Sequence, residues 1–340
     1  MTFTVSVATD TVECRPDQPI LDALLRGSVW MPNSCNQGTC GTCKLRVVSG
    51  SVDHGQSPED TLTPAEREQG FALACQATPC SDTVVERLDA PPAGTVHALR
   101  DLVGTVSAIE DVARDTRRVL VTLDSPLEFS AGQYVELRVP GTDHGRQYSM
   151  ANTPGESKQL EFHIRRQPGG VATDGWVFGS MSVGEPVEMV GPLGDFRLDP
   201  GDEGPMILLG GGTGLAPLKS IIRHALSTTP GRAIHLYHGV REEADLYDVD
   251  LLREWERAHR GFRYVPCLSG QTWSGRSGYV SDAFVEDFDT CRGYSGYLCG
   301  PPAMVDAGVK AFKRRRMAPR RIFREKFACR TRPSQYSANA

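Results

Sequence analysis

The sequence lacks a long apolar run, a leader segment and a large net charge. Its 340 residues contain no stretch approaching the roughly 20 apolar residues that a membrane-spanning helix needs. The first ten residues have neither a basic part nor an apolar part, so nothing indicates secretion. The net charge at pH 7 is −5. We therefore expect a cytoplasmic protein that binds no membrane.

The small net charge is unevenly distributed. Residues 1–89 contain twelve acidic and six basic residues, whereas residues 310–332 contain eleven basic residues and one acidic residue, Glu325. A basic segment of this kind occurs in nucleic-acid-binding proteins, but a solvated helix face is the favoured interpretation, and we expect no nucleic-acid partner. A docking surface for an acidic partner, or for the chain's own acidic first part, remains open.

Four of the ten cysteines follow a spacing that holds an iron–sulfur cluster. Cys35, Cys40 and Cys43 form C-x4-C-x2-C, and Cys75 follows at a distance. In a cytosolic chain cysteines are seldom paired in disulfides, and this spacing is that of the plant-type 2Fe-2S ferredoxins. The other cysteines are scattered, and most are expected to be small buried apolar residues. We predict that these four cysteines are the cluster ligands.

The residues around these cysteines support a cluster over other metal sites. Gly38 and Gly41 allow the tight, partly left-handed backbone with which a short loop wraps a cluster. Zinc ribbons use two C-x2-C arms, and this segment has one. A Rieske site needs two histidine ligands, and the segment's only histidine is His54. Over about ninety residues the sequence resembles the plant-type ferredoxin family.

The length and the local patterns predict three structural units. The chain is too long for one ordinary core. Residues 1–90 combine alternating strands, a short helix and the ligand loop, which predicts a small α+β unit, the β-grasp fold if the ferredoxin resemblance holds. Residues 90–94 read as a proline- and glycine-rich linker. Residues 97–202 show alternating strands typical of an antiparallel β-barrel. Residues 203–340 alternate buried strands with helices, which predicts an α/β doubly wound parallel sheet.

The barrel segment carries residues suited to a flavin dinucleotide. Arg146-Gln-Tyr-Ser149 is expected in a turn after the third barrel strand. Arg146 is a bidentate donor for a pyrophosphate, Tyr148 offers a flat face to a flavin ring, and Ser149 a small hydroxyl near flavin N5. Gly169, Gly170 and Thr173 stand at a glycine-rich helix start, where backbone amides bind phosphate.

In this order these segments resemble the ferredoxin–NADP reductase family over about residues 97–327. The resemblance implies FAD as the cofactor, with further contacts from the strand Phe162–Arg166 and the loop after it. The expected additional flavin contacts are His163, Ile164, Arg165 and Val171.

A second glycine-rich turn points to a nicotinamide dinucleotide. Gly211, Gly212, Thr213 and Gly214 follow the buried strand 206–209 and open a helix that contains Pro217. Such a turn directs amides and the helix dipole at a pyrophosphate, and the missing side chains let it approach.

Downstream, Cys299, Gly300, Pro301 and Pro302 form a C-G-P-P segment that resembles the reductase family's motif beside the nicotinamide ring. In that family the thiol and backbone help to place the nicotinamide against flavin N5, while a redox nucleophile is the less favoured role for Cys299.

The reductase resemblance also implies a residue that covers the flavin. Many members have an aromatic residue near the carboxyl end that shields the flavin until nicotinamide displaces it. Phe327 is the candidate here, with Glu325 beside the site. In the plant enzymes the chain ends on that aromatic, whereas thirteen residues follow Phe327. A core residue is the alternative role for Phe327.

The acidic segment after the second strand of the nucleotide unit favours NADH over NADPH. Glu242, Glu243 and Asp245 suit free ribose hydroxyls and repel a 2′-phosphate, whereas Arg241 would attract one.

The order ferredoxin, flavin barrel and nucleotide unit resembles the reductase components of multicomponent bacterial oxygenases. The resemblance implies that electrons pass from NADH through FAD and the 2Fe-2S cluster, one at a time, to an oxygenase hydroxylase component. We expect a monomer. A deoxysugar dehydratase or a cytochrome as acceptor, and a redox sensor without catalytic purpose, remain alternatives.

Overall fold

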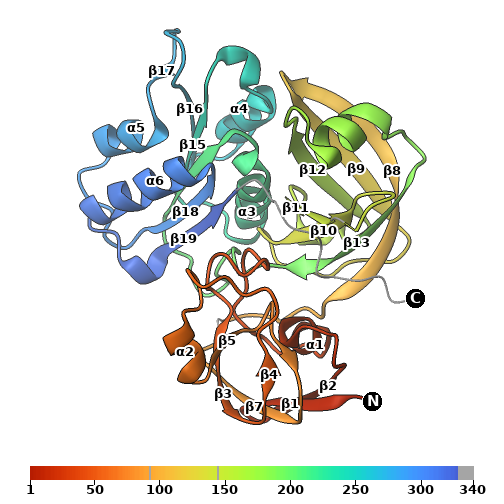
Figure 1. The fold of residues 1–340 in the computed structure, drawn as a ribbon. Helices are drawn as coiled ribbons and strands as arrows, with labels where there is room; N and C mark the ends of the chain where they lie inside the picture. The colour runs from red at the N-terminus through yellow and green to blue at the C-terminus, as the bar shows by residue number, and fades with distance from the viewer. Residues whose placement is uncertain (92, 144, 328–340) are drawn as a thin grey trace.

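The computed structural model describes residues 1–91, 93–143 and 145–327 and contains three units (Figure 1). The amino-terminal unit lies below the other two and turns its long loops toward them, while the barrel and the nucleotide unit lie side by side above it (Figure 1). No helix in these described ranges is both long and apolar enough to cross a bilayer. The predicted multidomain architecture is confirmed.

The amino-terminal unit is a five-stranded sheet in the order β2-β1-β7-β3-β5, with a small second sheet of β4 and β6. Its elements are β1 (Phe3–Val7), β2 (Asp10–Cys14), α1 (Ile20–Arg26), β3 (Lys44–Ser49), β4 (Val52–Asp53), α2 (Pro64–Glu68), β5 (Phe71–Leu73), β6 (Thr78–Pro79) and β7 (Thr83–Arg87). α1 buries Ile20, Leu21, Leu24 and Leu25. α2 begins with a capping box, because Thr63 accepts from the Glu66 amide and Glu66 accepts from the Thr63 amide.

The second unit is an antiparallel barrel of six strands in the order β11-β10-β13-β8-β9-β12. Its elements are β8 (Arg100–Ala113), β9 (Thr116–Leu123), β10 (Tyr134–Arg138), β11 (Gly145–Ser149), η1 (Pro154–Glu156), β12 (Gln159–Arg165), η2 (Val171–Ser180) and β13 (Pro186–Leu193). An isolated bridge between Met150 and Phe162 joins the two outer strands and closes the barrel.

The third unit is a parallel sheet in the order β17-β16-β15-β14-β18-β19. Its elements are β14 (Met206–Gly211), η3 (Gly212–Gly214), α3 (Leu215–Thr228), β15 (Ile234–Val240), η4 (Glu243–Asp245), α4 (Val249–Ala258), β16 (Phe262–Leu268), β17 (Arg276–Ser277), α5 (Val280–Asp287), β18 (Ser295–Gly300), α6 (Pro302–Arg314), η5 (Pro319–Arg321) and β19 (Ile322–Lys326). The strand order reverses between β14 and β18, and ligands of such sheets bind outside the carboxyl ends of the strands at this point.

The structure departs from the sequence-based expectation in one motif and adds several elements. Arg146–Ser149 lies in strand β11, paired with β10, rather than in a turn. The pairing of Tyr134 with Ser149 places the motif along the barrel wall. β13, β17, β19 and α5 were not anticipated, because they are short or their residues do not alternate clearly.

Candidate functional site

The four predicted ligand cysteines form two thiol pairs. Cys40 hydrogen-bonds Cys35, and Cys75 hydrogen-bonds Cys43. None of the four is in a disulfide. A cluster of two irons and two sulfides needs two protein thiolates on each iron, so a pair of pairs is the donor set that suits it. The residues therefore fit a 2Fe-2S cluster.

The ligand loop directs hydrogen-bond donors at the sulfurs. The Gln37 amide and the Thr39 hydroxyl both lie 3.4 Å from Cys35 Sγ, and the Thr42 amide lies 3.5 Å from Cys40 Sγ. The Cys40 thiol, together with the Thr39 hydroxyl, lowers the pKa of Cys35 to about 5 despite its burial. These donors thus favour the thiolate form of Cys35, whereas the hydrogen bond with Cys35, and then burial, raise the pKa of the Cys40 thiol.

Two glycines shape this loop, as the sequence predicts. Gly38 has φ +79° and Gly41 has φ +72°. A Cβ at Gly38 would also lie 2.9 Å from the Gln76 side chain, so the position needs glycine for space as well as for backbone conformation.

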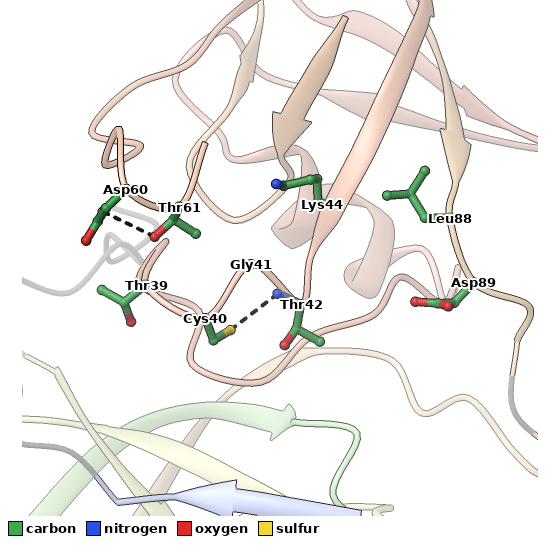
Figure 2. Close-up of a pocket in the computed structure, with 9 residues that line it drawn as sticks. All are labelled: Thr39, Cys40, Gly41, Thr42, Lys44, Asp60, Thr61, Leu88 and Asp89. Carbon is green, nitrogen blue, oxygen red and sulfur yellow. Dashed lines mark hydrogen bonds between the residues drawn. The ribbon is translucent and has the colours of Figure 1, made fainter. Parts of the chain in front are cut away.

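One ligand is exposed at an open hollow on the amino-terminal unit. Figure 2 shows Cys40 on the floor of this hollow. The other lining residues are Thr39, Gly41, Thr42, Lys44, Asp60, Thr61, Leu88 and Asp89. Because Cys43 and Cys75 are buried and Cys40 is exposed, the cluster site is nearest to solvent here.

The opposite side of the ligand loop rests on the flavin barrel. Gln147 Nε2 donates to the backbone oxygen of Cys35 at 2.9 Å. The Tyr134 hydroxyl donates to the Ser34 carbonyl at 2.6 Å and accepts from Asn36 Nδ2 at 2.8 Å. These contacts join the first cluster ligand directly to strands β10 and β11.

A second group of contacts forms the same interface. Trp30 Nε1 donates to Asp195 Oδ1 at 2.9 Å, and the Asn33 amide donates to the other oxygen at 2.8 Å. The Gly194 amide donates to Asn33 Oδ1 at 2.7 Å. We call the contacts of Trp30–Asn36 with the barrel the ferredoxin–barrel seam. Sequence reasoning missed it, because no motif marks residues that join two units.

The residues of the flavin motif lie on a strand that is only partly covered. Arg146 and Tyr148 alternate on β11 and are both half-buried. The Tyr148 ring lies 6.5 Å from the Phe162 ring, which supports it from below. An aromatic ring backed by the barrel core and flanked by a guanidinium suits a flavin and its phosphates.

The predicted glycine loop already binds an anion of the chain itself. Asp174 accepts from the Gly169 amide at 2.9 Å and from Arg166 Nε at 2.6 Å. These contacts lower the pKa of Asp174. Gly170 caps η2, and a Cβ there would lie 2.8 Å from Thr173 Oγ1. The loop can therefore hold an anion, but Asp174 occupies the Gly169 amide here and the Gly170 amide donates to the Gln167 carbonyl, so the fit to FAD rests on Tyr148 and Arg146.

Two glycines of the dinucleotide turn are needed because the end of β18 packs directly against them. A Cβ at Gly214 would lie 2.1 Å from the Cys299 carbonyl oxygen, and one at Gly211 would lie 2.8 Å from Pro301 Cδ. Gly212, at φ +54°, and Thr213 form the half-exposed tip of the turn. The glycines thus let the turn after β14 pack against the end of β18.

The C-G-P-P segment closes the same edge of the sheet. Cys299 pairs with Gly210 in the parallel register of β18 and β14. Burial, and then the nearby Glu325, raise the pKa of the Cys299 thiol well above its ordinary value. It is therefore a protonated thiol, unsuited to act as a nucleophile. Gly300 follows at φ +143°, and Pro301 and Pro302 start α6.

Three predicted residues from distant segments converge at the boundary of the two units. Ser149 Oγ lies 3.4 Å from Glu325 Oε2, and Glu325 pairs with Cys299 across β18 and β19. Burial raises the pKa of Glu325 to about 8, and the Ser149 hydrogen bond opposes this rise. The carboxyl group is therefore protonated at neutral pH. Ser149, Glu325 and Cys299 form one small polar group where nicotinamide and flavin would meet.

Phe327 lies next to this group. Its amide donates to the Gly300 carbonyl at 2.9 Å, which continues the line of β19 past the C-G-P-P segment. Its side chain is half-buried against the core of the nucleotide unit. Its role as a flavin cover stays a prediction. Residues 328–340, including the end of the basic segment, lie outside the described part of the chain.

The remaining predicted contacts are located as follows. The His163 side chain points into the boundary with the nucleotide unit, where it meets Tyr247, so only its backbone remains for a flavin. Ile164 is buried in the barrel core, and Pro217 is buried within α3. Arg165 is exposed near Gly212, and Val171 is exposed at the start of η2.

Family comparisons agree with all three units. The 2Fe-2S iron-sulfur cluster binding domain matches residues 3–80. The oxidoreductase FAD-binding domain matches residues 104–198, and the oxidoreductase NAD-binding domain matches residues 208–310.

Relatives of known role cover nearly the whole chain. An aromatic O-demethylase reductase subunit from an Amycolatopsis species is 62% identical over 96% of this chain and 99% of its own length. The reductase component of phenol 2-monooxygenase from a Pseudomonas species is 39% identical over 95% of this chain and 93% of its own. The crystal structure of an Amycolatopsis cytochrome P450 reductase superposes with a TM-score of 0.93 at 61% identity, covering 96% of this chain and 99% of that one. The chain therefore belongs to the family of 2Fe-2S flavoprotein reductases that are the reductase components of multicomponent oxygenases, with binding domains for a 2Fe-2S cluster, FAD and NAD.

Proposed function

We propose that this chain oxidises NADH and supplies single electrons to a cytochrome P450 that removes methyl groups from aromatic ethers. The relative that is 62% identical is the reductase subunit of an aromatic O-demethylase, which supports this acceptor class. The observation that carries the electron route is the hydrogen bond from Gln147, between Arg146 and Tyr148 of the flavin strand, to the backbone of the cluster ligand Cys35. We further propose that the protein acts as a cytoplasmic monomer.

The chain's own residues would bind the two dinucleotides, orient them toward each other and shield them from water. When bound, FAD accepts two electrons from NADH as hydride and releases them one at a time to the cluster. Gly211 and Gly214 let the dinucleotide turn pack closely against the end of β18, which fixes where the turn would present its amides to a nicotinamide dinucleotide. Ser149 and the protonated Glu325 place neutral hydrogen-bonding groups at the boundary, where a fixed charge would be costly to bury.

We propose NADH as the preferred reductant. Glu242 and Asp245 follow β15 and hold Arg114 of the barrel at 2.7 Å and 2.8 Å. These pairs neutralise Arg114, whereas Arg241, which would attract a 2′-phosphate, is exposed beside the exposed carboxylate of Glu243. Comparing kcat/KM for NADH and NADPH tests this preference, and a ratio near one or below would contradict it.

We propose that the acceptor docks over the hollow at Cys40. This ligand is the exposed one, and Asp60 and Asp89 line the same hollow. The only lysine of the hollow, Lys44, is paired with Glu66 at 2.6 Å, which leaves the carboxylates to meet basic side chains of an acceptor.

The acceptor is tested by anaerobic reduction under carbon monoxide. The full-length holoprotein, NADH and a cytochrome P450 O-demethylase should yield the reduced carbon monoxide complex with its absorption near 450 nm. In air, an aromatic methyl ether should then release formaldehyde in step with NADH consumption. Rapid flavin reduction without any reduced cytochrome would contradict this acceptor class and leave the reductase assignment intact.

A di-iron hydroxylase of the phenol-hydroxylating kind is the second candidate. The similarity to the reductase component of phenol 2-monooxygenase, at 39% identity over most of the chain, supports this candidate. Product formation with such a hydroxylase, and none with the cytochrome, would select it.

A further inference from the structure

Strand β12 presents different faces to the barrel and to the nucleotide unit. Leu160, Phe162 and Ile164 are buried in the barrel core. The alternate residues Glu161 and His163 lie on the other face, which the nucleotide unit covers. Polar side chains on a covered strand face must find partners in the opposing unit.

Glu161 is one member of a charge cluster buried between the two units. Lys219 Nζ lies 2.8 Å from Glu161 Oε1 and 2.8 Å from Asp248 Oδ2, and Lys219 is only 4% exposed. Arg118 of β9 pairs with both carboxylates as well. Two cations and two buried carboxylates therefore meet, and the exposed Glu110 also pairs with Arg118, at 2.8 Å. Lys219 lies in the second turn of α3, the helix that the dinucleotide turn opens.

This cluster is not a metal site. One oxygen or nitrogen from each of Glu161, His163 and Asp248 lies within 4.8 Å of the others, a spacing that would suit a cation. The ammonium group of Lys219 occupies that position, within 2.8 Å of both carboxylates.

A chain of hydrogen bonds between uncharged groups, which we call the neutral relay, connects the same strand to the tip of the dinucleotide turn. His163 Nε2 lies 2.7 Å from Glu161, and its Nδ1 lies 3.1 Å from the Tyr247 hydroxyl. That hydroxyl lies 3.5 Å from the Gly212 carbonyl, so its single proton serves one of two acceptors at a time. The Gly212 carbonyl is also 3.1 Å from His238 Nε2.

Buried ion pairs of this kind contribute little net stability, because the cost of desolvation offsets their attraction. Any arrangement that separates the charges is nevertheless strongly destabilised, because it leaves a buried charge without a partner. A cluster that joins β12 to α3 and a relay that joins β12 to Gly212 both act on the dinucleotide turn. We propose that Glu161, His163, Lys219, Tyr247 and Asp248 are positioning residues that set the dinucleotide turn, and with it the nicotinamide, against the flavin. The inference rests on the proposed function only in requiring that NADH reduce the bound flavin.

The first test removes one charge of each sign. In the holoprotein, Lys219→Met with Asp248→Asn keeps the charge balanced between Arg118 and Glu161, and asparagine tolerates the left-handed backbone of residue 248, at φ +55°. We expect stopped-flow flavin reduction by NADH to slow by about 10- to 100-fold, the cost of a small misplacement of reacting groups. The isotope effect with NADH deuterated at C4 should rise, while KM for NADH changes less than kcat.

A readout independent of turnover is amide hydrogen exchange in the absence of NADH. Peptides covering residues 210–218 should exchange faster in the double variant, whereas peptides of residues 1–89 should not change. Faster exchange together with slower hydride transfer supports the proposal. A lower melting temperature with unchanged exchange and an unchanged flavin reduction rate would overturn it.

A pair of tyrosine variants keeps the test valid if the double variant does not fold. Tyr247→Phe removes a hydroxyl that bridges His163 and Gly212, whereas Tyr264→Phe removes a buried hydroxyl that has no hydrogen-bond partner within the described chain. Tyr247→Phe should raise both the isotope effect and the exchange rate of residues 210–218, and Tyr264→Phe should change neither. Equal behaviour of the two variants would contradict a positioning role. Flavin reduction of the wild type by NADH, measured alongside, tests the proposed function separately.

Discussion

Glu325 is a buried carboxyl group at the boundary of the flavin barrel and the nucleotide unit. Burial raises its pKa to about 8, from an ordinary value of 4.5. Between these two pH values the folded chain keeps a proton that the unfolded chain releases. The free energy of unfolding contributed by Glu325 therefore falls as the pH rises from 4.5 to about 8, and is constant above that.

Replacing Glu325 by glutamine should remove this pH dependence. The slope expected for one proton is about 1.4 kcal/mol per pH unit. Urea unfolding of both proteins at several pH values between 5 and 8 measures it, and the difference between them cancels all other titrating groups. The variant should gain stability relative to the wild type as the pH rises. Parallel curves would show that Glu325 is ionised in the folded protein.

Phe327→Ala should expose the flavin to nicotinamide if Phe327 is its cover. An aromatic ring stacked on the flavin must leave before nicotinamide approaches to about 3–3.5 Å. Without this competitor, titration with NAD should produce a lasting charge-transfer absorption beyond the flavin bands, and product release should slow. A core role predicts instead an unchanged spectrum and a loss of stability below the 3–5 kcal/mol typical of fully buried phenylalanine, because this side chain is half-buried.

The sequence predicts residues whose chemistry is local and misses those defined by contacts between units. The cysteine spacing and the glycine turns predict candidate binding residues because each site would be formed largely by a few neighbouring residues. Glu325 could be named only through a family resemblance, and its contact with Ser149 joins residues 176 positions apart. Tyr134 and Gln147 carry no signal for their contacts with the ligand loop, since each stands in an ordinary strand.

At the scale of elements, the strand–turn–helix from β14 to α3 depends on close approach to β18. Gly214 has an ordinary helical backbone, at φ −60°, so only space requires glycine there. The neighbouring atoms belong to the backbone of Cys299 and Gly300, which cannot rotate away as a side chain can.

Gly214→Ala should therefore separate the turn from β18 and impair NADH binding. Overpacking of this kind lowers the free energy of unfolding by about 1–3 kcal/mol. The displaced turn should also weaken NADH binding by about tenfold or more, which corresponds to ~1.4 kcal/mol per factor of ten. Thermal unfolding and NAD titration measure the two effects. The control is Gly155→Ala in η1, where the nearest atom would lie 3.9 Å from the new Cβ and no change is expected. Normal NAD affinity in Gly214→Ala would contradict the packing argument.

Regular elements were predicted where the period is clear, as in the alternating strands of the barrel and the buried parallel strands of the third unit. The structure adds β13 and β19, whose sequences defeat a local pattern. β13 ends in Gly-Pro-Leu and is buried on both faces toward that end, so it shows no clean alternation. β19 reads Ile-Phe-Arg-Glu-Lys and is recognisable as a strand only because β18 offers it a free edge.

At the scale of the whole molecule, the three units meet in the order in which electrons are to pass. The dinucleotide turn lies against β12 and β18. Strand β11 contacts β19 through Ser149 and Glu325, and it contacts the ligand loop through Gln147 and Cys35. The residues that touch across each boundary lie on the strands that carry the predicted binding groups.

Gln147→Leu should slow the passage of electrons from flavin to cluster without affecting NADH oxidation. The Cys35 carbonyl loses its donor, and a hydrogen bond of this kind contributes ~1 kcal/mol net, or about fivefold in the equilibrium constant for docking of the loop. Cytochrome c reduction should fall by up to about fivefold, while NADH–ferricyanide activity should not change. A proportional fall in both activities would place the defect at the flavin instead.

The ferredoxin–barrel seam also decides which parts of such chains are interchangeable. A ferredoxin unit grafted from a relative would bring all four of its own cysteines, yet it would dock only with an indole for Asp195 and an amide side chain for Gly194. Trp30 and Asn33 supply these groups here, just ahead of the first ligand. Compatibility between modules thus depends on Trp30–Asn36 on one side and on Tyr134, Gln147 and residues 194–195 on the other, and a designer of hybrid reductases would transfer both sets together.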